Sequence, residues 1–313
     1  MSHEPIASMI AHIQIVWTLA LVLGPLAWLV ALWPHSPAWA LGGVGAGWVI
    51  FALVMGLQFT LMHAANRSDP APRASAAQVW RAWWVEMGVA LAVFCWRQPF
   101  RSRSIPDWLP AAPTRQRGVV LVHGFLCNRG LWLPWMQRLR AGGHAYVAVN
   151  LEPVFGSIDA YPAIIEDAVR RVTQATGMAP MVIGHSMGGL ATRAWLRACG
   201  GDARVHHVIT LGTPHGGTWL GRYSQATNGQ QMRLGGDWVR QLQADEPPAR
   251  ASLFTCWYSN CDNIVFPAGT AALPGAAHRF IEGVPHVDMA CHPEVVQACL
   301  GALAASVGAE KIE

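Results

Sequence analysis

Charge is what this sequence lacks most clearly, because no Asp, Glu, Lys or Arg occurs between Glu4 and Arg67. Over the whole chain only 13% of residues are charged, while 52% are hydrophobic. A soluble domain of ordinary composition does not run this far without a charge. The stretch is therefore expected to lie in lipid or to be deeply buried.

Lysine is nearly absent as well, since Lys311 is the only one among 22 cationic residues, and the net charge is a mild +4. No cluster of cations is interleaved with aromatic residues in the way that favours nucleic acid, so no nucleic-acid partner is expected. The sequence has no H-E-x-x-H motif, and the Cys291-His292 pair alone is too little for zinc. We therefore predict no metal and no cofactor.

The seven cysteines are an odd number, which leaves at least one thiol unpaired. Cys256 with Cys261, or Cys291 with Cys299, could pair in an oxidising compartment. We favour reduced cysteines that pack as small apolar side chains.

Two long apolar runs, residues 6–33 and 38–62, each exceed the roughly 20 residues that cross a hydrocarbon core. The segment Pro34–Pro37 breaks the helix between them, and Trp33 and Trp39 flank the break as interfacial tryptophans do. The first run is too long for a cleaved signal peptide, and no basic segment precedes it. Residues 1–63 are therefore predicted to form a transmembrane hairpin, which makes the lipid bilayer a partner.

Small and polar residues within these runs predict how the two helices approach each other and where the first one meets the membrane interface. Gly43 and Gly47 form a small-xxx-small pair that would let the two helices approach closely. His12 and Gln14 lie near the start of the first run, so we place them at the membrane interface rather than at its centre.

Residues 64–117 are predicted to connect the hairpin to the rest of the chain. Residues 79–96 are apolar but short, and Arg81 and Glu86 fall in their first half, which favours an amphipathic helix lying in the interface over a third span. Residues 97–117 hold five arginines and four prolines, a basic linker that suits an anionic lipid surface.

From Gly118 onward, strand patterns alternate with helix patterns, which indicates an α/β fold with a mostly parallel central sheet covered by helices on both faces. The predicted strands are 118–123, 145–150, 181–184, 205–211, 252–258 and 278–281, and the predicted helices are 131–141, 159–176, 187–198 and 293–307. Residues 214–250 are polar and break this rhythm, so we predict a lid insertion there within a catalytic domain of residues 118–313.

The segment Gly184–Gly188 matches the G-x-S-x-G nucleophile elbow and stands between a short apolar strand and a helix, which is the setting the motif requires. Its glycines allow the strained turn, and the following helix points its positive end at the site. Ser186 is therefore the predicted nucleophile.

A serine hydroxyl needs a base, and the elbow fold places the acid and then the histidine later in the chain. Asp262 follows the strand 252–258, so it is the candidate acid, with Asp237, Asp245 and Asp288 as alternatives. His286 stands between the last strand and the last helix, so it is the candidate base.

The alternatives for the base are His278 and His292. The histidine beside the nucleophile, His185, is expected to pack beneath the elbow. The oxyanion hole is predicted from two backbone N–H groups, those of Met187 and Phe125. His123, which begins the loop of Phe125, is expected to bond within that loop.

The motifs His123-Gly124-Phe125, Gly184-His185-Ser186-Met187-Gly188-Gly189 and Leu211-Gly212-Thr213-Pro214-His215-Gly216-Gly217, with the late Asp262 and His286, resemble bacterial triacylglycerol lipases and carboxylesterases. The resemblance covers about residues 118–305 and leaves out the first 100 residues. It implies the α/β-hydrolase fold, ester hydrolysis through an acyl-enzyme, and a mobile lid. Secreted members hold calcium beside the histidine, and Asp288 matches one such ligand, but no second carboxylate does.

The sequence thus predicts a bacterial inner-membrane esterase or lipase. The candidates for lining its acyl pocket, which could equally be ordinary core residues, are Phe125, Leu126, Trp132, Trp219 and Leu220. A phospholipase, a thioesterase or an acyltransferase would use the same triad, and a catalytically silent membrane scaffold is the alternative of another class.

The arginines between hairpin and catalytic domain predict that this domain faces the cytoplasm, because cations stay on the cytoplasmic side. A span at 79–96 would instead put the domain in the periplasm. The oligomeric state is not legible in the sequence.

Overall fold

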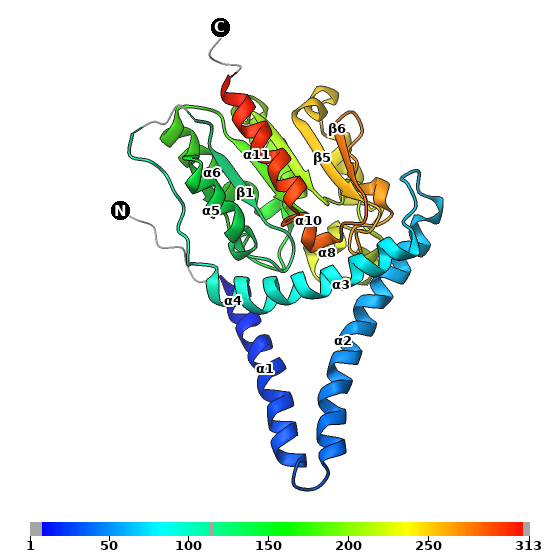
Figure 1. The fold of residues 1–313 in the computed structure, drawn as a ribbon. Helices are drawn as coiled ribbons and strands as arrows, with labels where there is room; N and C mark the ends of the chain where they lie inside the picture. The colour runs from blue at the N-terminus through cyan, green and yellow to red at the C-terminus, as the bar shows by residue number, and fades with distance from the viewer. Residues whose placement is uncertain (1–7, 113–115, 309–313) are drawn as a thin grey trace.

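The computed structural model describes residues 8–112 and 116–308, in which a helical hairpin projects from a globular body (Figure 1). The hairpin consists of α1 (Met9–Leu32) and α2 (Pro37–Ala65). Both helices are long and apolar enough to cross a membrane, with a mean hydropathy of 2.3 and 2.0. The helices diverge from their turn toward the body, so the hairpin is widest where it meets the body (Figure 1).

The two hairpin helices meet near their turn through a tryptophan. Trp28 Nε1 donates to the carbonyl oxygen of Trp39 at 3.3 Å. A Cβ on Gly43 would lie 2.1 Å from that nitrogen, so any larger residue would require the indole to move, whereas nothing lies within 4 Å of a Cβ on Gly47. The predicted role of Gly47 in close helix approach is therefore wrong, and Gly43 accommodates a side chain rather than a facing backbone.

The segment after the hairpin crosses beneath the body. Here α3 (Ala76–Ala92) begins at a capping box between Ser75 and Gln78 and continues through the π turn η2 (Val93–Arg97) into α4 (Gln98–Arg101). Figure 1 shows α3 lying across the open end of the hairpin rather than beside α1 and α2. The axis of α3 is thus not parallel to the axes of the two hairpin helices.

The body contains a six-stranded sheet in the order β2-β1-β3-β4-β5-β6, and every neighbouring pair is parallel. Each strand lies within two residues of a predicted boundary on at least one side. The strands are β1 (Val119–Val122), β2 (Tyr146–Ala148), β3 (Met181–His185), β4 (His207–Leu211), β5 (Phe254–Ser259) and β6 (Ala277–Ile281). The predicted α/β class is confirmed.

Helices cover both faces of the sheet because successive strand residues point to opposite sides. Val119 and Leu121 pack in one buried cluster and Val120 and Val122 in the other. The first face is covered by α5 (Leu133–Ala141) and α11 (Pro293–Gly308), and the second by α6 (Pro162–Thr176) and α7 (Met187–Cys199). Shorter helices are η1 (Asn66–Ser68), η3 (Arg129–Trp132), η4 (Ile158–Ala160), η5 (Gly201–Arg204), η8 (Ala268–Ala271) and α10 (His286–Met289).

The segment predicted as a lid contains η6 (Trp219–Tyr223), α8 (Thr227–Gln231), α9 (Asp237–Ala244) and the start of η7 (Pro248–Leu253). Buried polar contacts attach it to the body. Asn228 Nδ2 donates to the carbonyl oxygen of Val154 at 2.8 Å. Fully buried Arg193 pairs with Glu246, with Nη2 and Oε2 2.6 Å apart. The whole segment is thus not a free flap.

All seven cysteines are free thiols, in line with the reduced state we favoured.

Candidate active site

Ser186 occupies the turn between β3 and α7, so the elbow motif stands in its expected strand–turn–helix setting. Its backbone has a φ of 55° and a ψ of −129°, a combination that residues with side chains rarely adopt. Two bonds hold the turn: the Ser186 N–H donates to the Leu211 oxygen at 2.9 Å, and Thr213 Oγ1 donates to the Ser186 oxygen at 2.9 Å. The surrounding structure thus fixes a strained position, as functional sites often do.

The elbow glycines are required by close backbone contacts. A Cβ on Gly184 would lie 2.7 Å from the nitrogen of Gly189, and one on Gly188 would lie 2.2 Å from the oxygen of Val122. Any larger residue would push α7 away from β1 and move Ser186 relative to the loop that follows β1.

His286 and Asp262 form a buried pair, with imidazole Nδ1 2.9 Å from Oδ2 of the carboxylate. The other carboxylate oxygen, Oδ1, accepts the N–H groups of Ile264 and Val265 at 3.0 and 2.7 Å. The two residues come from the loops after β5 and β6, where the chain order predicts them. Gly212, at a φ of 54°, passes so close that a Cβ there would lie 2.8 Å from Asp262 Oδ2.

The alternative residues do not join this pair. Asp237 and Asp245 lie in ion pairs on the surface of the insertion. His278 Nε2 bonds to the Leu273 oxygen at 2.8 Å. Across residues 8–112 and 116–308, neither the Asp288 carboxylate nor His292 has a hydrogen bond to His286.

The pKa of His286 is raised by its carboxylate neighbours. Burial by itself lowers the pKa, but the charge and hydrogen bond of Asp262 and the charge of Glu86 outweigh it. An imidazole with a raised pKa is a stronger base, which is the property that a proton acceptor for a serine hydroxyl needs.

Two further histidines are buried, neutral and structural, as expected. Burial lowers the pKa of His123 to about 4, and its ring bridges the oxygen of Gly124 at 2.8 Å and the N–H of Leu151 at 3.0 Å. Burial and the neighbouring His286 lower the pKa of His185 to about 3, and its Nε2 donates to the His286 oxygen at 3.0 Å. Both rings fix loops beside Ser186.

The two residues predicted to supply the oxyanion donors lie next to Ser186, one in the elbow and one in the loop after β1. Met187 begins α7, and Phe125 follows Gly124, whose Cβ would lie 3.3 Å from Ser186 Oγ. Within the described part of the chain, the N–H groups of Met187 and Phe125 donate to no protein acceptor. Both donors are therefore free to bind an oxyanion.

A second carboxylate besides that of Asp262 contacts the loop that holds His286, and it belongs to Glu86 of α3. It is 1% exposed, and it accepts the N–H groups of Val287 at 2.9 Å and of Asp288 at 3.3 Å. Burial raises the pKa of Glu86 to about 7, against the lowering effects of the Val287 bond and of His286. Sequence reasoning used this residue only to argue for an amphipathic helix. The signal was an acid among the apolar residues that follow Arg81 in this helix.

The hairpin helices also contact catalytic loops through single polar side chains. Gln14 of α1 donates from Nε2 to the Leu126 oxygen at 3.1 Å, beside the predicted oxyanion loop. Gln58 of α2 accepts Asn263 Nδ2 at 2.9 Å, next to Asp262. The sequence predicted an interfacial position for Gln14 and did not predict its hydrogen bond to the loop beside Ser186. An isolated polar residue in an apolar run was the available signal for both.

Ser186 and His286 face a cavity of about 530 Å³. Of the predicted acyl-pocket residues, Phe125 and Leu126 line it. Trp132 does not, because it is wholly buried in the core beneath the sheet, and Trp219 and Leu220 pack around Phe266 in a separate cluster. These three assignments are corrected: large apolar side chains look alike in the sequence whether they fill a core or line a pocket.

Replacing Glu86 by glutamine is expected to move the acidic limb of the kcat/KM profile to lower pH. The amide still accepts the Val287 N–H, but the negative charge that Glu86 carries when it is ionised, above its pKa of about 7, and that raises the pKa of His286 is gone. Since His286 must be neutral to accept a proton, activity is lost as the pH falls through its pKa, and the variant loses it later. A pH–rate profile on a short-chain nitrophenyl ester measures the shift.

The matched control is Glu282→Gln, because Glu282 is an exposed carboxylate that bonds Gln78 of α3. Its profile should coincide with that of the unmodified protein. An unchanged limb in Glu86→Gln would refute the electrostatic role of this residue.

Comparison with known proteins fits this geometry. A family model described as palmitoyl protein thioesterase matches residues 118–269. The mature form of Bacillus licheniformis lipase BlEst2 has a similar structure, with a TM-score of 0.56 and 17% identity over 63% of this chain and 96% of that one. Its propeptide form has a TM-score of 0.52 and 18% identity over 59% and 49%.

Aspergillus fumigatus lipase B is also similar, with a TM-score of 0.54 and 17% identity over 65% of this chain and 57% of that one. No curated protein sequence matches the chain. At these identities the solved structures establish the fold rather than the substrate. The chain therefore has the α/β-hydrolase fold, and its structure resembles those of lipases and esterases.

Proposed function

We propose that this protein is a membrane-anchored serine hydrolase that cleaves lipid-like carboxylic esters through an acyl-enzyme. The observation that carries the proposal is the placement of Ser186 and the Asp262–His286 pair at one largely apolar cavity. An apolar cavity with a few convergent polar groups is the usual form of a site for an apolar substrate.

The proposed reaction begins with proton transfer from Ser186 to His286. Because Nδ1 is held by Asp262, the other ring nitrogen, Nε2, accepts the proton while Oγ attacks the ester carbonyl. The N–H groups of Met187 and Phe125 stabilise the oxyanion, and His286 returns the proton to the departing alcohol. Water then releases the acid from Ser186 by the same steps.

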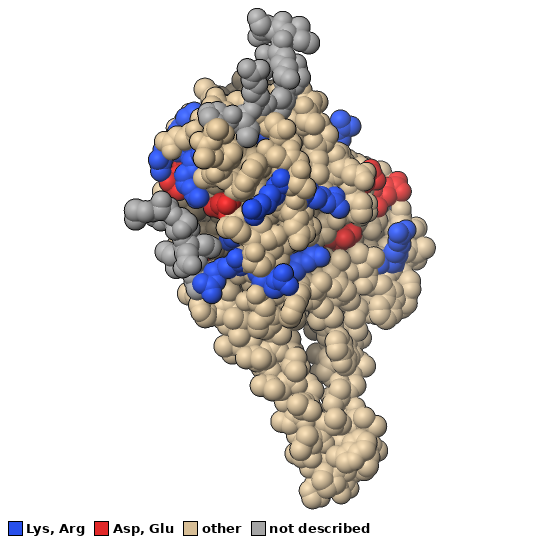
Figure 2. All heavy atoms as spheres, turned by 60° about the vertical axis from the view of Figure 1, so that its left-hand side comes forward, with Lys and Arg blue, Asp and Glu red and all other residues tan. Residues whose placement is uncertain are grey.

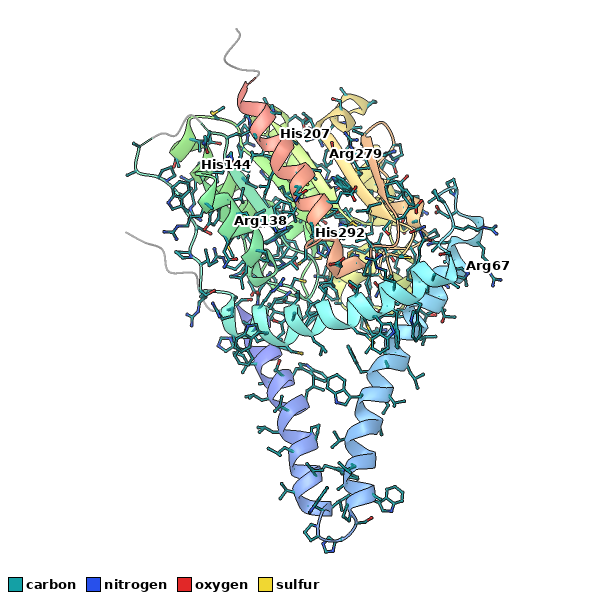
Figure 3. All side chains as sticks on the ribbon, in the orientation of Figure 1. Arg67, Arg138, His144, His207, Arg279 and His292 are labelled. Atoms are coloured by element: carbon teal, nitrogen blue, oxygen red, sulfur yellow. The ribbon has the colours of Figure 1, made fainter. Side chains whose placement is uncertain are left out.

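The proposal of a membrane anchor rests on the surface of the hairpin. Figure 2 shows Lys and Arg side chains on the body, whereas the hairpin carries none on the face drawn. Apolar side chains such as Leu53 and Val30 are 67% exposed there. At the level where the hairpin meets the body lie the exposed Trp80 and Trp84 of α3, and Arg67 follows α2 (Figure 3). Tryptophan and arginine at that level are typical of a membrane interface.

Thioester hydrolysis is the second candidate, and the match to the palmitoyl protein thioesterase family favours it. The same serine, base and oxyanion donors serve both reactions, since only the leaving group differs. Turnover of nitrophenyl esters from two to sixteen carbons, beside a palmitoyl thioester, by the detergent-solubilised protein tests both. We expect rates that rise with chain length. No turnover of either class would contradict the proposal.

We propose further that the anchor lies in a bacterial inner membrane with the hydrolase body in the cytoplasm. Two spans return the chain to its starting side, and the arginines lie after the second span while the turn Pro34–Pro37 has no cation. Alkaline phosphatase fused to residue 313 should therefore be inactive, because it works only after export. A green fluorescent protein fused at the same residue is the matched control and should fluoresce. A strongly active phosphatase fusion would place the body in the periplasm.

A further inference from the structure

The cavity at Ser186 does not end within the body but continues between the two hairpin helices. Its wall includes Ile13, Trp17 and Leu21 of α1 and Phe51 and Met55 of α2. The α1 residues that line it recur at helical spacing and form one face of that helix. These residues are Ile10, Ile13, Gln14, Trp17, Thr18 and Leu21.

This face is long enough to reach well into a membrane. From Ile10 to Leu21 the helix rises by about 16 Å at its usual rise of about 1.5 Å per residue. The hydrocarbon core of a bilayer is about 30 Å thick, so the wall spans about one leaflet. A ligand that lay along it would extend from Ser186 toward the bilayer centre.

The cavity opens sideways between the helices. Trp17 and Leu21 line it and yet are 64% and 57% exposed, so their side chains also form its rim. The helices diverge toward the body beneath α3 (Figure 1), and residues of both helices line the cavity there. If the hairpin spans the bilayer, this rim contacts lipid chains and not water.

The chemistry of the wall changes along its length. Its carboxylate and imidazole groups, those of Glu86, His185 and His286, belong to the body and to α3, and neither helix of the hairpin has a charged residue between Pro5 and Asn66. The outer part is apolar apart from the uncharged Gln14, Thr18 and Gln58. A peptide or a charged headgroup would leave its polar groups unpaired there, whereas an acyl chain would not.

We infer that α1 and α2 form an acyl-binding groove through which a membrane-resident ester reaches Ser186 sideways, with its acyl chain still in the bilayer. The inference rests on the proposed function and gives it a substrate class, long-chain acyl esters of membrane lipids. Each methylene moved into water lowers the occupancy of a site roughly four-fold, so passage through water would be prohibitive for a long chain. The groove avoids that passage.

The contacts of Gln14, Gln58 and Glu86 with the catalytic loops support this role. They join each of the three N-terminal helices to a loop beside Ser186, Asp262 or His286, which aligns the groove with the reacting atoms. An anchor that only tethered the body would need no such alignment.

A matched pair of leucines on α1 tests the groove. Leu21 lines the cavity, Leu19 does not, and both are exposed, so both accept tryptophan without disturbing the core. The full chain is reconstituted in phosphatidylcholine vesicles and supplied with nitrophenyl palmitate or nitrophenyl butyrate. Leu21→Trp fills the outer groove and should lower the palmitate-to-butyrate ratio of kcat/KM by about 10²-fold, the effect of some three or four methylenes losing contact. Leu19→Trp should leave the ratio unchanged.

Equal ratios in the two variants would overturn the groove. A second measurement does not depend on turnover: the Ser186→Ala protein is irradiated in vesicles that contain a palmitoyl ester with a diazirine at the chain end. Labels on Leu21 and Phe51 in excess over those on the exposed Leu19 and Leu53, which do not line the cavity, support the groove. Labels confined to the body overturn it. Hydrolysis without hairpin labels would refute the groove alone, whereas hairpin labels without hydrolysis by the unmodified protein would refute the proposed function.

Discussion

Replacing Ser186 by alanine is expected to lower kcat for ester hydrolysis by about 10⁴- to 10⁶-fold. The substitution removes the attacking oxygen and leaves only the oxyanion donors and the binding of the acyl group. The fold should be kept, because the bonds that hold the turn involve the Ser186 backbone and not its hydroxyl. Steady-state kinetics on nitrophenyl butyrate, with circular dichroism beside it, measures both effects.

Ser252→Ala is the control for this substitution. Ser252 lies at the surface of the body, where its hydroxyl bonds the Ala249 oxygen at 2.8 Å, and its loss should not change the rate. Substantial turnover by Ser186→Ala would place the nucleophile elsewhere.

Replacing His286 by alanine is expected to cost a similar factor, about 10⁴-fold or more, because Ser186 then has no base. Asp262→Asn should be nearly as severe, about 10⁴-fold. The amide can still accept the N–H groups of Ile264 and Val265 through its oxygen, so the loop is kept. Its NH₂ group, however, cannot accept a hydrogen bond from the Nδ1–H group, and the imidazole is then held in the wrong tautomer. Steady-state measurement of kcat/KM for both variants gives the loss of activity.

His278→Ala is the matched control for the histidine. Its ring bonds the Leu273 oxygen at the edge of the sheet, away from the Asp262–His286 pair, so we expect near-normal rates. If His278→Ala or His292→Ala were the crippling change, the assignment of the base would be wrong.

The parts of the site that the sequence predicts are those set by local chemistry or chain order. Ser186 could be identified because a strained turn between a strand and a helix requires glycines at fixed positions around it. Asp262 and His286 followed from the order in which a parallel sheet presents its loops. Short continuous apolar runs likewise located inner strands such as β1 and β3, since both faces of these strands are buried.

The parts that the sequence did not predict depend on contacts between distant segments. Glu86 bonds Val287, which lies 201 positions later, and Gln58 bonds Asn263, which lies 205 positions later. No periodicity or motif links such pairs. The lining of the predicted acyl pocket was only partly right for a related reason, because Trp132 and Phe125 are equally apolar and only packing places one in the core and the other at the cavity.

The sequence also did not predict that the hairpin contributes to the cavity beside Ser186. The run from Pro5 to Asn66 indicates a membrane by composition alone, and composition carries no information about what the helices contact. The structure shows that α1, α2 and α3 supply part of the cavity wall. The hairpin is therefore part of the site as well as the proposed means of attachment to a membrane.

Mapping of the residue that a fluorophosphonate modifies tests the central claim most directly. The full chain, solubilised in detergent, is treated with the probe, digested and analysed by mass spectrometry. The account predicts one phosphonylated residue, Ser186, with labelling abolished in both Ser186→Ala and His286→Ala. An adduct on a different residue, or ester hydrolysis by a protein that takes up no probe, would contradict it.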